Sequence, residues 1–461
     1  MSLSSSKRTS CRYNEANLLG EKGTSMNRHH HPISAAITSL TLILALTGCS
    51  VANAIAPLPK VTVTATATDT PTTTPIPTPT TTPTPTEIPF YLTATVWTGN
   101  LQAPLLLYHE FVPNDVEKST ATKTRLEDFG NQIQKLYDAG FSLVSLQSWL
   151  DGSFVVPEGR KPLVITLDDG LFANQLYINA DGTPNTDSGL GVLWSFSQSH
   201  PDFGFSAAIF MIMGDKYYAD VQAGDRFILG EGNAWMDKFG QTIAWGIDHG
   251  VMPYNHTYQH VELDITKNAD IVDQLRQNDY ALRNFLERVG RSDLVPRLGN
   301  MLALPFGIWP ATQSGIQILQ NYKDPEGRPM QAIFEAYNYA EATWTPSVFS
   351  PGYNRFNLPR DTASNAMVDL IVQNKDNFPA AQACQLGPLP ESDQANTSVI
   401  QTAIENAIST DACPAGVYNV DGNVFVASAD KVELFKTKSD PTAATPTTTS
   451  SPILPSITPT P

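Results

Sequence analysis

Two adjacent acidic residues end an apolar segment in the middle of the chain, and their types and spacing suit hydrolytic chemistry. The segment Pro162–Gly170 reads PLVITLDDG, in which Leu163–Leu167 is a run typical of a buried strand. Because successive strand residues point to opposite faces, we expect Asp168 and Asp169 to diverge, one toward a metal ion and the other toward a substrate or a water. An ordinary Asp-Gly turn is the alternative interpretation.

Two histidines four residues apart are a second group of candidate ligands. They lie in Asn255–His260, which reads NHTYQH, and the spacing of His256 and His260 predicts two imidazoles on one side of a helical turn. Two imidazoles and one carboxylate leave coordination positions open for water, as a catalytic metal site requires. A polar surface turn is the alternative for this hexapeptide taken alone, but the two motifs together favour a metal site.

The combined motifs predict a metal-assisted hydrolysis. Asp169, His256 and His260 are the predicted ligands of a divalent ion, for which this mixture of nitrogen and oxygen atoms favours zinc and leaves cobalt, nickel or manganese open. Asp168 is the predicted general base that accepts a proton from the attacking water.

Several segments resemble, in the same order, those of the polysaccharide deacetylases of carbohydrate esterase family four, the NodB-homology domain. They are LLLYHEF at 105–111, TLDDG at 166–170, FGFSAAIFMI at 203–212, NHTYQH at 255–260, LALPFG at 302–307 and FNLPRD at 356–361. The resemblance covers about residues 103–361. It implies an α/β fold, a distorted (β/α) barrel of about seven strands, and metal-dependent deacetylation of a polysaccharide.

The resemblance also implies roles around the predicted ligands, and the chain departs from the family at two of them. The backbone N–H of Phe306, in the PPYG-like motif, would stabilise the oxyanion. The family's late histidine is missing, because His260 is the last histidine of the chain, and LALPFG lacks the arginine that precedes the family's motif. In these absences, and in the segments TWTP and NLPRD, the chain resembles the branch of the family that deacetylates poly-N-acetylglucosamine-like polymers.

That branch places a histidine after its first strand near the active site. By this resemblance His109 is the predicted general acid, and Arg360 a substitute partner for Asp168. The alternatives are a structural, hydrogen-bonded histidine and a structural ion pair. Tyr108, Trp309 and Trp344 are candidate substrate-binding residues, with core packing as the alternative for the two tryptophans.

Three functions remain open from the sequence. The first is removal of N-acetyl groups from an N-acetylglucosamine polymer. The second is an O-acetyl esterase of the xylan type, whose leaving group depends less on a strong acid. The third is a catalytically inactive carbohydrate-binding protein on the same fold.

The beginning of the chain predicts export. From a start at Met26, Arg28 precedes an apolar run at 33–46 that is too short for a comfortable transmembrane helix and suits a signal peptide. The run ends in LTGC, which resembles a bacterial lipobox and makes Cys49 the candidate lipid-bearing residue. A plain signal peptide cut after Ala52 or Ala54, or an uncleaved anchor, are the alternatives. We therefore assign residues 1–55 to export, and expect a cell-surface lipoprotein or a secreted protein.

Composition separates two tails from the globular part. Residues 56–89 and 437–461 are rich in threonine and proline and cannot bury a core, so they are predicted to be a linker and a tail. The net charge of −16 argues against nucleic acid or an anionic membrane surface as partner. We expect a polysaccharide substrate, membrane contact only through an N-terminal lipid or anchor, and no obligate protein partner.

The elements that must hold the site alternate between strands and helices. A strand at 104–107, a helix at 125–139, a strand at 141–146 and the strand at 163–167 indicate a parallel α/β arrangement. Such barrels keep their chemistry at the carboxyl ends of the strands. Further on we expect a strand at 205–213, an expanded loop at 214–239 carrying Trp235, and helices at 241–249 and 265–289.

The globular part is predicted to divide into a catalytic domain at 90–361 and a C-terminal extension at 362–436. Cys384 and Cys413 are candidates for a disulfide in an exported protein, with two free thiols as the alternative. Residues 417–426, with Asp421-Gly422 in the middle, predict a β-hairpin.

Overall fold

The structure is a computed structural model that describes residues 90–115, 118–170, 172–214, 234–336, 344–389, 393 and 396–438. The predicted export segment 1–55 with Cys49, the linker 56–89 and nearly all of the tail 437–461 lie outside these residues. The described residues belong to one unit, Pro83–Pro461.

Seven parallel strands form the sheet that positions the predicted site. In spatial order they are β11 (Ala332–Phe334), β10 (Met301–Ala303), β9 (Val251–Asn255), β8 (Ala207–Met211), β7 (Lys161–Leu167), β3 (Leu105–Tyr108) and β13 (Asp361–Thr362). β6 (Phe141–Leu143) pairs in parallel with the start of β7. Strands such as β8, whose residues are all buried, read as continuous apolar runs because both faces of a parallel sheet are covered.

One segment brings the two edges of this curled sheet together. Leu358 forms a parallel bridge with Phe334 at the end of β11, and its N–H donates to the carbonyl of Ile333 at 3.0 Å. Three residues later, Asp361 pairs with Leu106 of β3. Because the same stretch contacts both edge strands, the sheet forms a distorted barrel. The predicted fold class, an α/β barrel of about seven strands, is confirmed.

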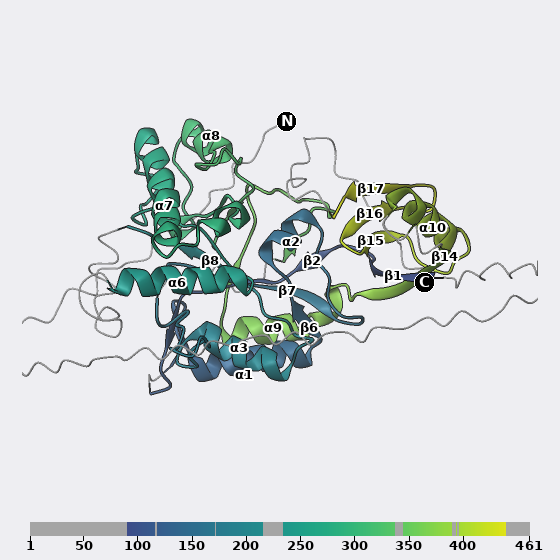
Figure 1. Ribbon diagram of the computed structural model, residues 1–461, viewed down its shortest axis with the longest axis horizontal. Helices are drawn as coiled ribbons and strands as arrows, with labels where there is room; N and C mark the ends of the chain where they lie inside the picture. The colour runs from purple at the N-terminus through teal and green to yellow at the C-terminus, as the bar shows by residue number, and fades with distance from the viewer. Residues whose placement is uncertain are drawn as a thin grey trace, which may run out of the picture. The chain divides into compact units, whose positions relative to one another are not determined.

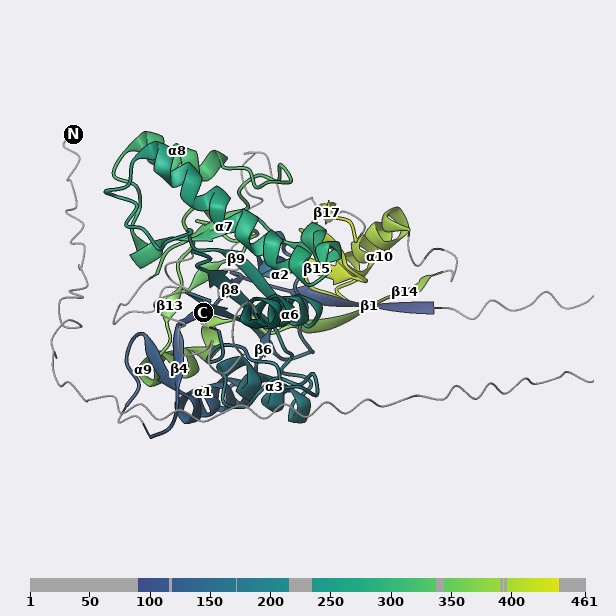
Figure 2. The same ribbon diagram turned by 60° about the vertical axis from the view of Figure 1, so that its left-hand side comes forward.

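Helices cover the outside of the barrel. Helices α1 (Leu126–Asp138), α3 (Gly189–Ser199) and α9 (Asn365–Gln373) lie side by side along one face (Figures 1 and 2). Helix α7 (Asn268–Arg288) lies between α6 (Ala234–Asp248) and α8 (Gln313–Asn321). The buried residues of α1, Phe129, Ile133 and Leu136, show the helical spacing that predicted this element.

Short elements connect these layers. They are β2 (Gln102–Ala103), which pairs with β12 (Thr345–Pro346), β4 (Glu110–Val112), which pairs with β5 (Lys123–Arg125), helix α2 (Leu146–Asp151), and the 3₁₀ helices η1 (Ser292–Arg297), η2 (Pro305–Gly307) and η3 (Lys375–Asn377).

The predicted loop at 214–239 is wrong at its end. Helix α6 begins at Ala234 and not at Gln241, so Trp235 lies in the first turn of the helix. Trp235, Phe239 and Ile243 are spaced by four residues and are all buried, which explains why the helix extends through them. Residues 215–233 lie outside the part of the chain that the structure describes.

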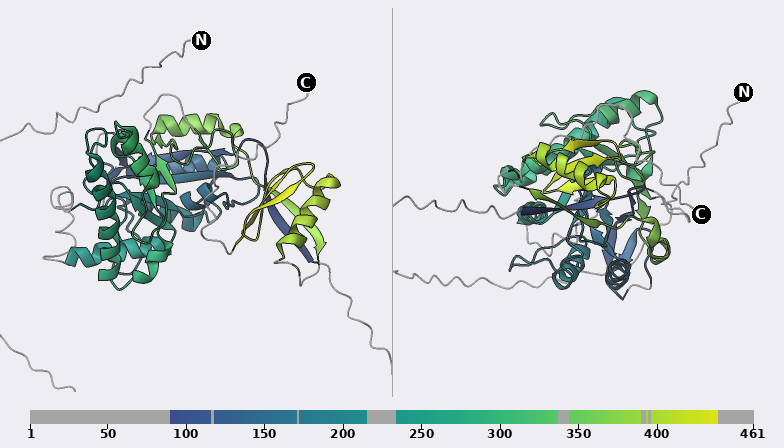
Figure 3. Two further views of the ribbon diagram at one scale, coloured as in Figure 1. Left: turned by 90° about the horizontal axis from the view of Figure 1, so that it is seen from above. Right: turned by 90° about the vertical axis from the view of Figure 1, so that its right-hand side faces the viewer.

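The C-terminal residues form a small lobe with its own sheet. The antiparallel order is β14 (Gln382–Leu389), β1 (Phe90–Trp97), β15 (Gly416–Val420), β16 (Asn423–Ala427) and β17 (Val432–Lys436). Helix α10 (Thr397–Ser409) packs on this sheet through Ile400 and Ile404 (Figure 3). The predicted hairpin is β15–β16, with positive φ angles at Asp421 and Gly422 in its turn.

The lobe divides the chain differently from the predicted boundary at 361/362. Strand β1 belongs to the lobe, because it pairs with β14 and β15. Helix α9, which follows that boundary, packs on α1 of the barrel instead. A disulfide joins Cys384 of β14 to Cys413 after α10, with Cα atoms 5.9 Å apart.

Among the described residues, no helix is both long enough and apolar enough to cross a membrane.

Candidate metal centre

The predicted ligands meet at the carboxyl ends of the barrel strands. Asp169 follows the end of β7, while His256 and His260 follow β9. One ligand atom from each of the three residues lies within 4.8 Å of the others. The sequence prediction that these three side chains share one place is therefore matched by the geometry.

The spacing of this cluster fits a divalent ion. Nε2 of His256 and Nε2 of His260 lie 3.7 Å and 3.9 Å from the same oxygen, Oδ1 of Asp169. In a tetrahedral site with bonds of usual length, ligand atoms are about 3.4 Å apart. The two histidine–aspartate distances exceed this value by a few tenths of an ångström, and the three ligand atoms lie within 4.8 Å of one another, so an inward movement of the side chains would bring all three around one ion.

Both imidazoles are prepared to act as ligands. Nδ1 of His256 donates to the carbonyl of Ala303 at 2.9 Å, which leaves the lone pair on Nε2, the atom facing Asp169. Burial, together with the neighbouring His256, lowers the pKa of His260 to about 3. His260 is therefore neutral at neutral pH, the form that binds a metal.

A loop, and not the predicted helical turn, holds the two histidines. β9 ends at Asn255, and Thr257 and His260 have φ angles of 64° and 51°, which no right-handed helix contains. The side chain of Asn255 fixes this loop: its oxygen accepts from the Thr257 N–H at 2.8 Å, and its nitrogen donates to the Leu275 carbonyl at 2.9 Å. The helical expectation was wrong because these hydrogen bonds, one local and one to helix α7, hold the backbone outside helical geometry.

The two aspartates converge, where strand alternation predicted that they diverge. Oδ2 of Asp168 and Oδ1 of Asp169 each lie 3.7 Å from Nε2 of His256. Asp169 has a φ of 74°, so strand geometry ends before it and the alternation no longer applies. Gly170 has a φ of 65°, and a Cβ there would lie 3.2 Å from the Cα of Met211, so glycine suits this turn.

Asp168 forms a buried, bidentate ion pair with Arg360. Nη1 and Nη2 of Arg360 donate to the two carboxylate oxygens at 2.6 Å and 2.8 Å, and the arginine is 0% exposed. Burial raises the pKa of Asp168, but the charges of Arg360 and then His256 lower it further, so the pKa lies below its ordinary value. Asp168 is therefore a carboxylate at neutral pH. The predicted contact between Arg360 and Asp168 is present in the structure.

His109 lies beside Asp168 on the neighbouring strand. Tyr108 pairs with Leu167, so the next residues, His109 and Asp168, share a register, and their side chains point to the same face. Burial lowers the pKa of His109, the charge of Asp168 opposes that shift, and Arg360 adds to it. Among the described residues, Nδ1 of His109 is buried without a hydrogen-bond partner.

Phe306 and Trp309 lie in the turn after β10. Phe306 is 42% exposed and its ring centroid lies 4.3 Å from that of His260, so this side chain lies against one member of the cluster. Phe306 has a φ of 55°. Asp169, Thr257 and His260 also have positive φ angles, so strained backbone is concentrated around the cluster. Trp309 is half-buried, and its Nε1 donates to a carboxylate oxygen of Glu335.

The predicted substrate-binding role of Tyr108 is wrong. Its side chain is 1% exposed, and its hydroxyl donates to Gln132 of α1 at 2.9 Å. The ring packs against Phe111 and Phe129 in the core between the sheet and α1. It points away from the barrel interior, because the pleat alternates and the next residue, His109, faces Asp168.

The predicted substrate-binding role of Trp344 is also wrong. Its ring lies 4.9 Å from that of Phe378, which in turn packs on Phe141. Phe141 pairs with Lys161, the first residue of β7, whereas Asp168 follows the last residue of that strand. Trp344 therefore packs at the end of the strands opposite the cluster.

Sequence reasoning missed Glu335. This residue follows the buried strand β11, is 7% exposed, and accepts through its backbone carbonyl from Nε of Arg360 at 3.2 Å. It therefore supports both Arg360 and Trp309. The available signal was an acidic residue directly after an apolar strand, the same signal that identified Asp168.

Comparisons with known proteins found similarity to solved structures. No family model and no curated protein matches the chain. Solved structures that it matches include the deacetylase PplD of Streptococcus pyogenes in complex with acetate, at 15% identity and a TM-score of 0.38 over 60% of this chain and 98% of that chain. IcaB from Ammonifex degensii matches at 16% and 0.39 over 60% and 97%, and a polysaccharide deacetylase from Bacillus cereus at 15% and 0.39 over 59% and 69%. At these identities and TM-scores the matches carry no argument about function.

Proposed function

We propose that the chain is an exported, metal-dependent polysaccharide deacetylase that hydrolyses N-acetyl groups of an N-acetylglucosamine-containing polymer. One observation carries the proposal: Asp169, His256 and His260 converge as ligands, while the ionised Asp168 lies 3.7 Å from His256 and is held by Arg360. One carboxylate is thus available to a metal and the other to a proton.

The side chains around the cluster divide the work of amide hydrolysis. Asp169, His256 and His260 would hold a divalent ion, for which we propose zinc, and that ion would polarise the acetyl carbonyl and lower the pKa of a bound water. Asp168 accepts the proton of the attacking water as its oxygen bonds to the carbonyl carbon. The N–H of Phe306 donates to the developing oxyanion.

Breaking the carbon–nitrogen bond requires a proton on the leaving amine, and we assign this role to His109. The lowered pKa of His109 makes its cationic form a stronger acid, although less of it is present at neutral pH. The products are acetate and the free amino sugar, which takes the proton. An amine leaves poorly without such an acid, so a histidine beside the base favours an amide substrate.

Other parts of the chain support the proposed substrate and the proposed location of the protein. The exposed ring of Phe306 offers an aromatic face beside the cluster for a pyranose ring, and we propose that Trp309, three residues further on, contributes a second face. The Cys384–Cys413 disulfide suits an oxidising compartment, and the predicted export segment 1–55 provides the route to it. We extend the resemblance of the motifs to propose a member of the NodB-homology deacetylases.

The test is acetate release by the purified protein with added zinc, cobalt, nickel or manganese. The substrates are N-acetylglucosamine oligomers and acetylated xylan, and an Asp168→Asn variant runs beside the wild type. We expect metal-dependent release from the oligomers that the variant lacks. Release from xylan alone would indicate an O-acetyl esterase. Tight metal and oligomer binding without any release would indicate a carbohydrate-binding protein.

A further inference from the structure

A buried glutamine connects the backbones of the two strands that carry His109 and Asp168. Gln175 is 1% exposed, and its Nε2 donates to the carbonyl of His109 at 2.8 Å and to the carbonyl of Asp168 at 2.6 Å. The carboxamide nitrogen has two hydrogens, so both bonds form at once. Gln175 thus binds the residues that follow β3 and β7.

The glutamine replaces a hydrogen bond that the sheet gives up at this point. The ladder between β3 and β7 continues as far as the bond from the Asp168 N–H to the Tyr108 carbonyl, at 2.9 Å. In a regular parallel ladder the next bond would run from the N–H of Glu110 to the carbonyl of Asp168. Glu110 instead donates to the carbonyl of Thr122 at 3.0 Å, because β4 turns away to pair with β5. Gln175 supplies the missing donor.

Gln175 is itself held in place by the start of α3. The N–H of Leu190 donates to the Gln175 carbonyl at 2.9 Å, and the N–H of Gly189 donates to the Asn174 carbonyl at 2.8 Å. These donors belong to the first turn of the helix, which has no intrahelical acceptors for them. Gln175 therefore forms a hydrogen-bonded bridge, which runs from the first turn of α3 through its carboxamide to the carbonyls of His109 and Asp168.

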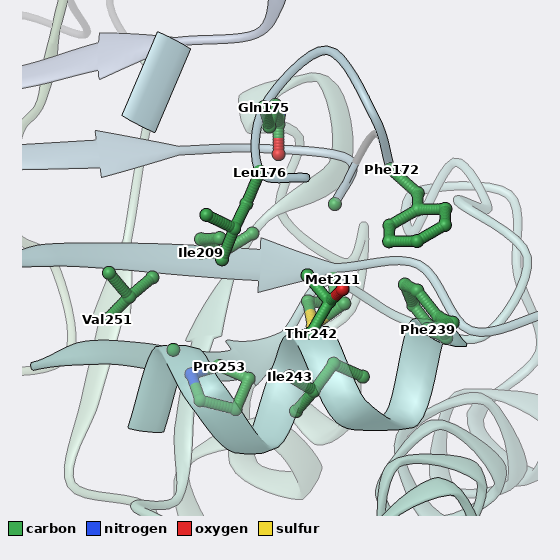
Figure 4. Close-up of a pocket in the computed structure, with 12 residues that line it drawn as sticks. Phe172, Gln175, Leu176, Ile209, Met211, Phe239, Thr242, Ile243, Val251 and Pro253 are labelled. Atoms are coloured by element: carbon green, nitrogen blue, oxygen red, sulfur yellow. The ribbon is translucent and has the colours of Figure 1, made fainter. Parts of the chain in front are cut away.

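The other end of the carboxamide lacks such bonds. Oε1 of Gln175 is buried without a hydrogen-bond partner among the described residues, as is Oγ1 of Thr242. Both residues line a cavity of about 30 Å³ that also contacts Gly170, Leu176 and Met211 (Figure 4). Gln175 therefore acts on the two strand ends through its carboxamide nitrogen.

We propose that Gln175 is a positioning residue that fixes His109 and Asp168 in register beside the metal cluster. It touches neither the ligands nor the substrate, and acts through the backbone of the proposed acid and base. Its catalytic consequence rests on the proposed function, whereas the bridge itself does not.

The test replaces Gln175 with methionine, which keeps the length of the side chain and removes both donors. Two variants of the same cavity are the controls: Leu176→Ala removes packing from the same loop, and Thr242→Val removes the other unpartnered oxygen. We expect Gln175→Met to lower kcat for acetate release about 10–100-fold, as loss of an outer supporting hydrogen bond typically does. KM and zinc affinity should stay within about twofold, and both controls should keep kcat.

A second measurement separates failure of the bridge from failure of the proposed function. Hydrogen exchange of the zinc-loaded protein reports the Asp168 N–H, whose protection should fall in Gln175→Met and remain in Thr242→Val. If the wild type releases no acetate, the proposed function fails and the exchange result still decides the bridge. Unchanged exchange, or a loss of kcat in Leu176→Ala equal to that in Gln175→Met, would overturn the proposal. Gln175→Asn, which is too short to reach both carbonyls, replaces the methionine variant if that protein does not fold.

Discussion

Replacing Arg360 with methionine removes the cation that contacts both oxygens of Asp168. The methionine keeps most of the side-chain volume, but it leaves a carboxylate that is 2% exposed without its ion-pair partner. Breaking one side of a buried ion pair costs about 3–5 kcal/mol. We expect the free energy of unfolding at pH 7 to fall by about this amount.

The loss should depend on pH in a direction that the pKa of Asp168 fixes. In the wild type this pKa lies below its ordinary value of 3.8, so the pair contributes stability above pH 3.8 and loses it as the pH falls through the folded-state pKa. Without Arg360, burial raises the pKa of Asp168 and the carboxyl group takes up a proton more readily. The difference between wild type and Arg360→Met should therefore shrink as the pH falls from 7 toward 4.

Urea unfolding at pH 7 and pH 4.5 measures both effects, and a double-mutant cycle with Asp168→Asn isolates the pair. Arg355→Met is a matched control, because Arg355 is half-buried and its guanidinium lies 4.6 Å from the ring centroid of Phe356. It should cost no more than about 1 kcal/mol. Additive effects of the two changes, or an Arg360→Met protein as stable as the wild type at pH 7, would refute the reasoning.

Three further changes test other parts of the structure. Replacing Cys384 and Cys413 by serine should lower the free energy of unfolding by about 3–4 kcal/mol and leave kcat unchanged. Thermal unfolding with and without reductant measures the stability, and an unchanged midpoint would contradict the prediction. His260→Ala should weaken zinc binding by more than about 100-fold in a chelator competition, whereas His249→Ala, a change of an exposed histidine, should not. Equal zinc affinities of the His260→Ala protein and the wild type would exclude His260 as a ligand. Burial raises the pKa of Asp279 to about 6, so its contribution to stability is present below pH 3.8 and is lost as the pH rises through 6. Relative to Asp279→Asn, the wild type should thus gain stability in urea unfolding as the pH falls from 7 to 4; a constant difference would disprove the shift.

The barrel and the candidate ligands were accessible from the sequence because each signal was local. The aliphatic run before Asp168 and the apolar periodicity of α1 each identify one element, and alternating strands and helices imply parallel pairing. Residues that follow parallel strands meet at one edge of the sheet, which brings Asp169, His256 and His260 together. Their prediction rested on the ligand types, the four-residue spacing of the histidines and the resemblance of the motifs.

The missed features depend on contacts between distant residues. No local pattern shows that β1 pairs with β14, nearly the whole globular chain away, or that Gln175 donates to two backbone carbonyls. The loop of His256 and the turn at Asp169 contain positive φ angles, and hydrogen bonds of the Asn255 side chain hold the loop. In each case tertiary contacts override the local expectation.

The division of roles between the two neighbouring aspartates is the central claim, and one paired measurement tests it most directly. Asp168→Asn and Asp169→Asn proteins, each checked for folding by circular dichroism, would be loaded with zinc and measured for bound zinc and for acetate release from N-acetylglucosamine oligomers. We predict that Asp168→Asn retains zinc and releases no acetate, whereas Asp169→Asn loses both. Zinc retained in Asp169→Asn, or acetate release at the wild-type rate by Asp168→Asn, would contradict the account.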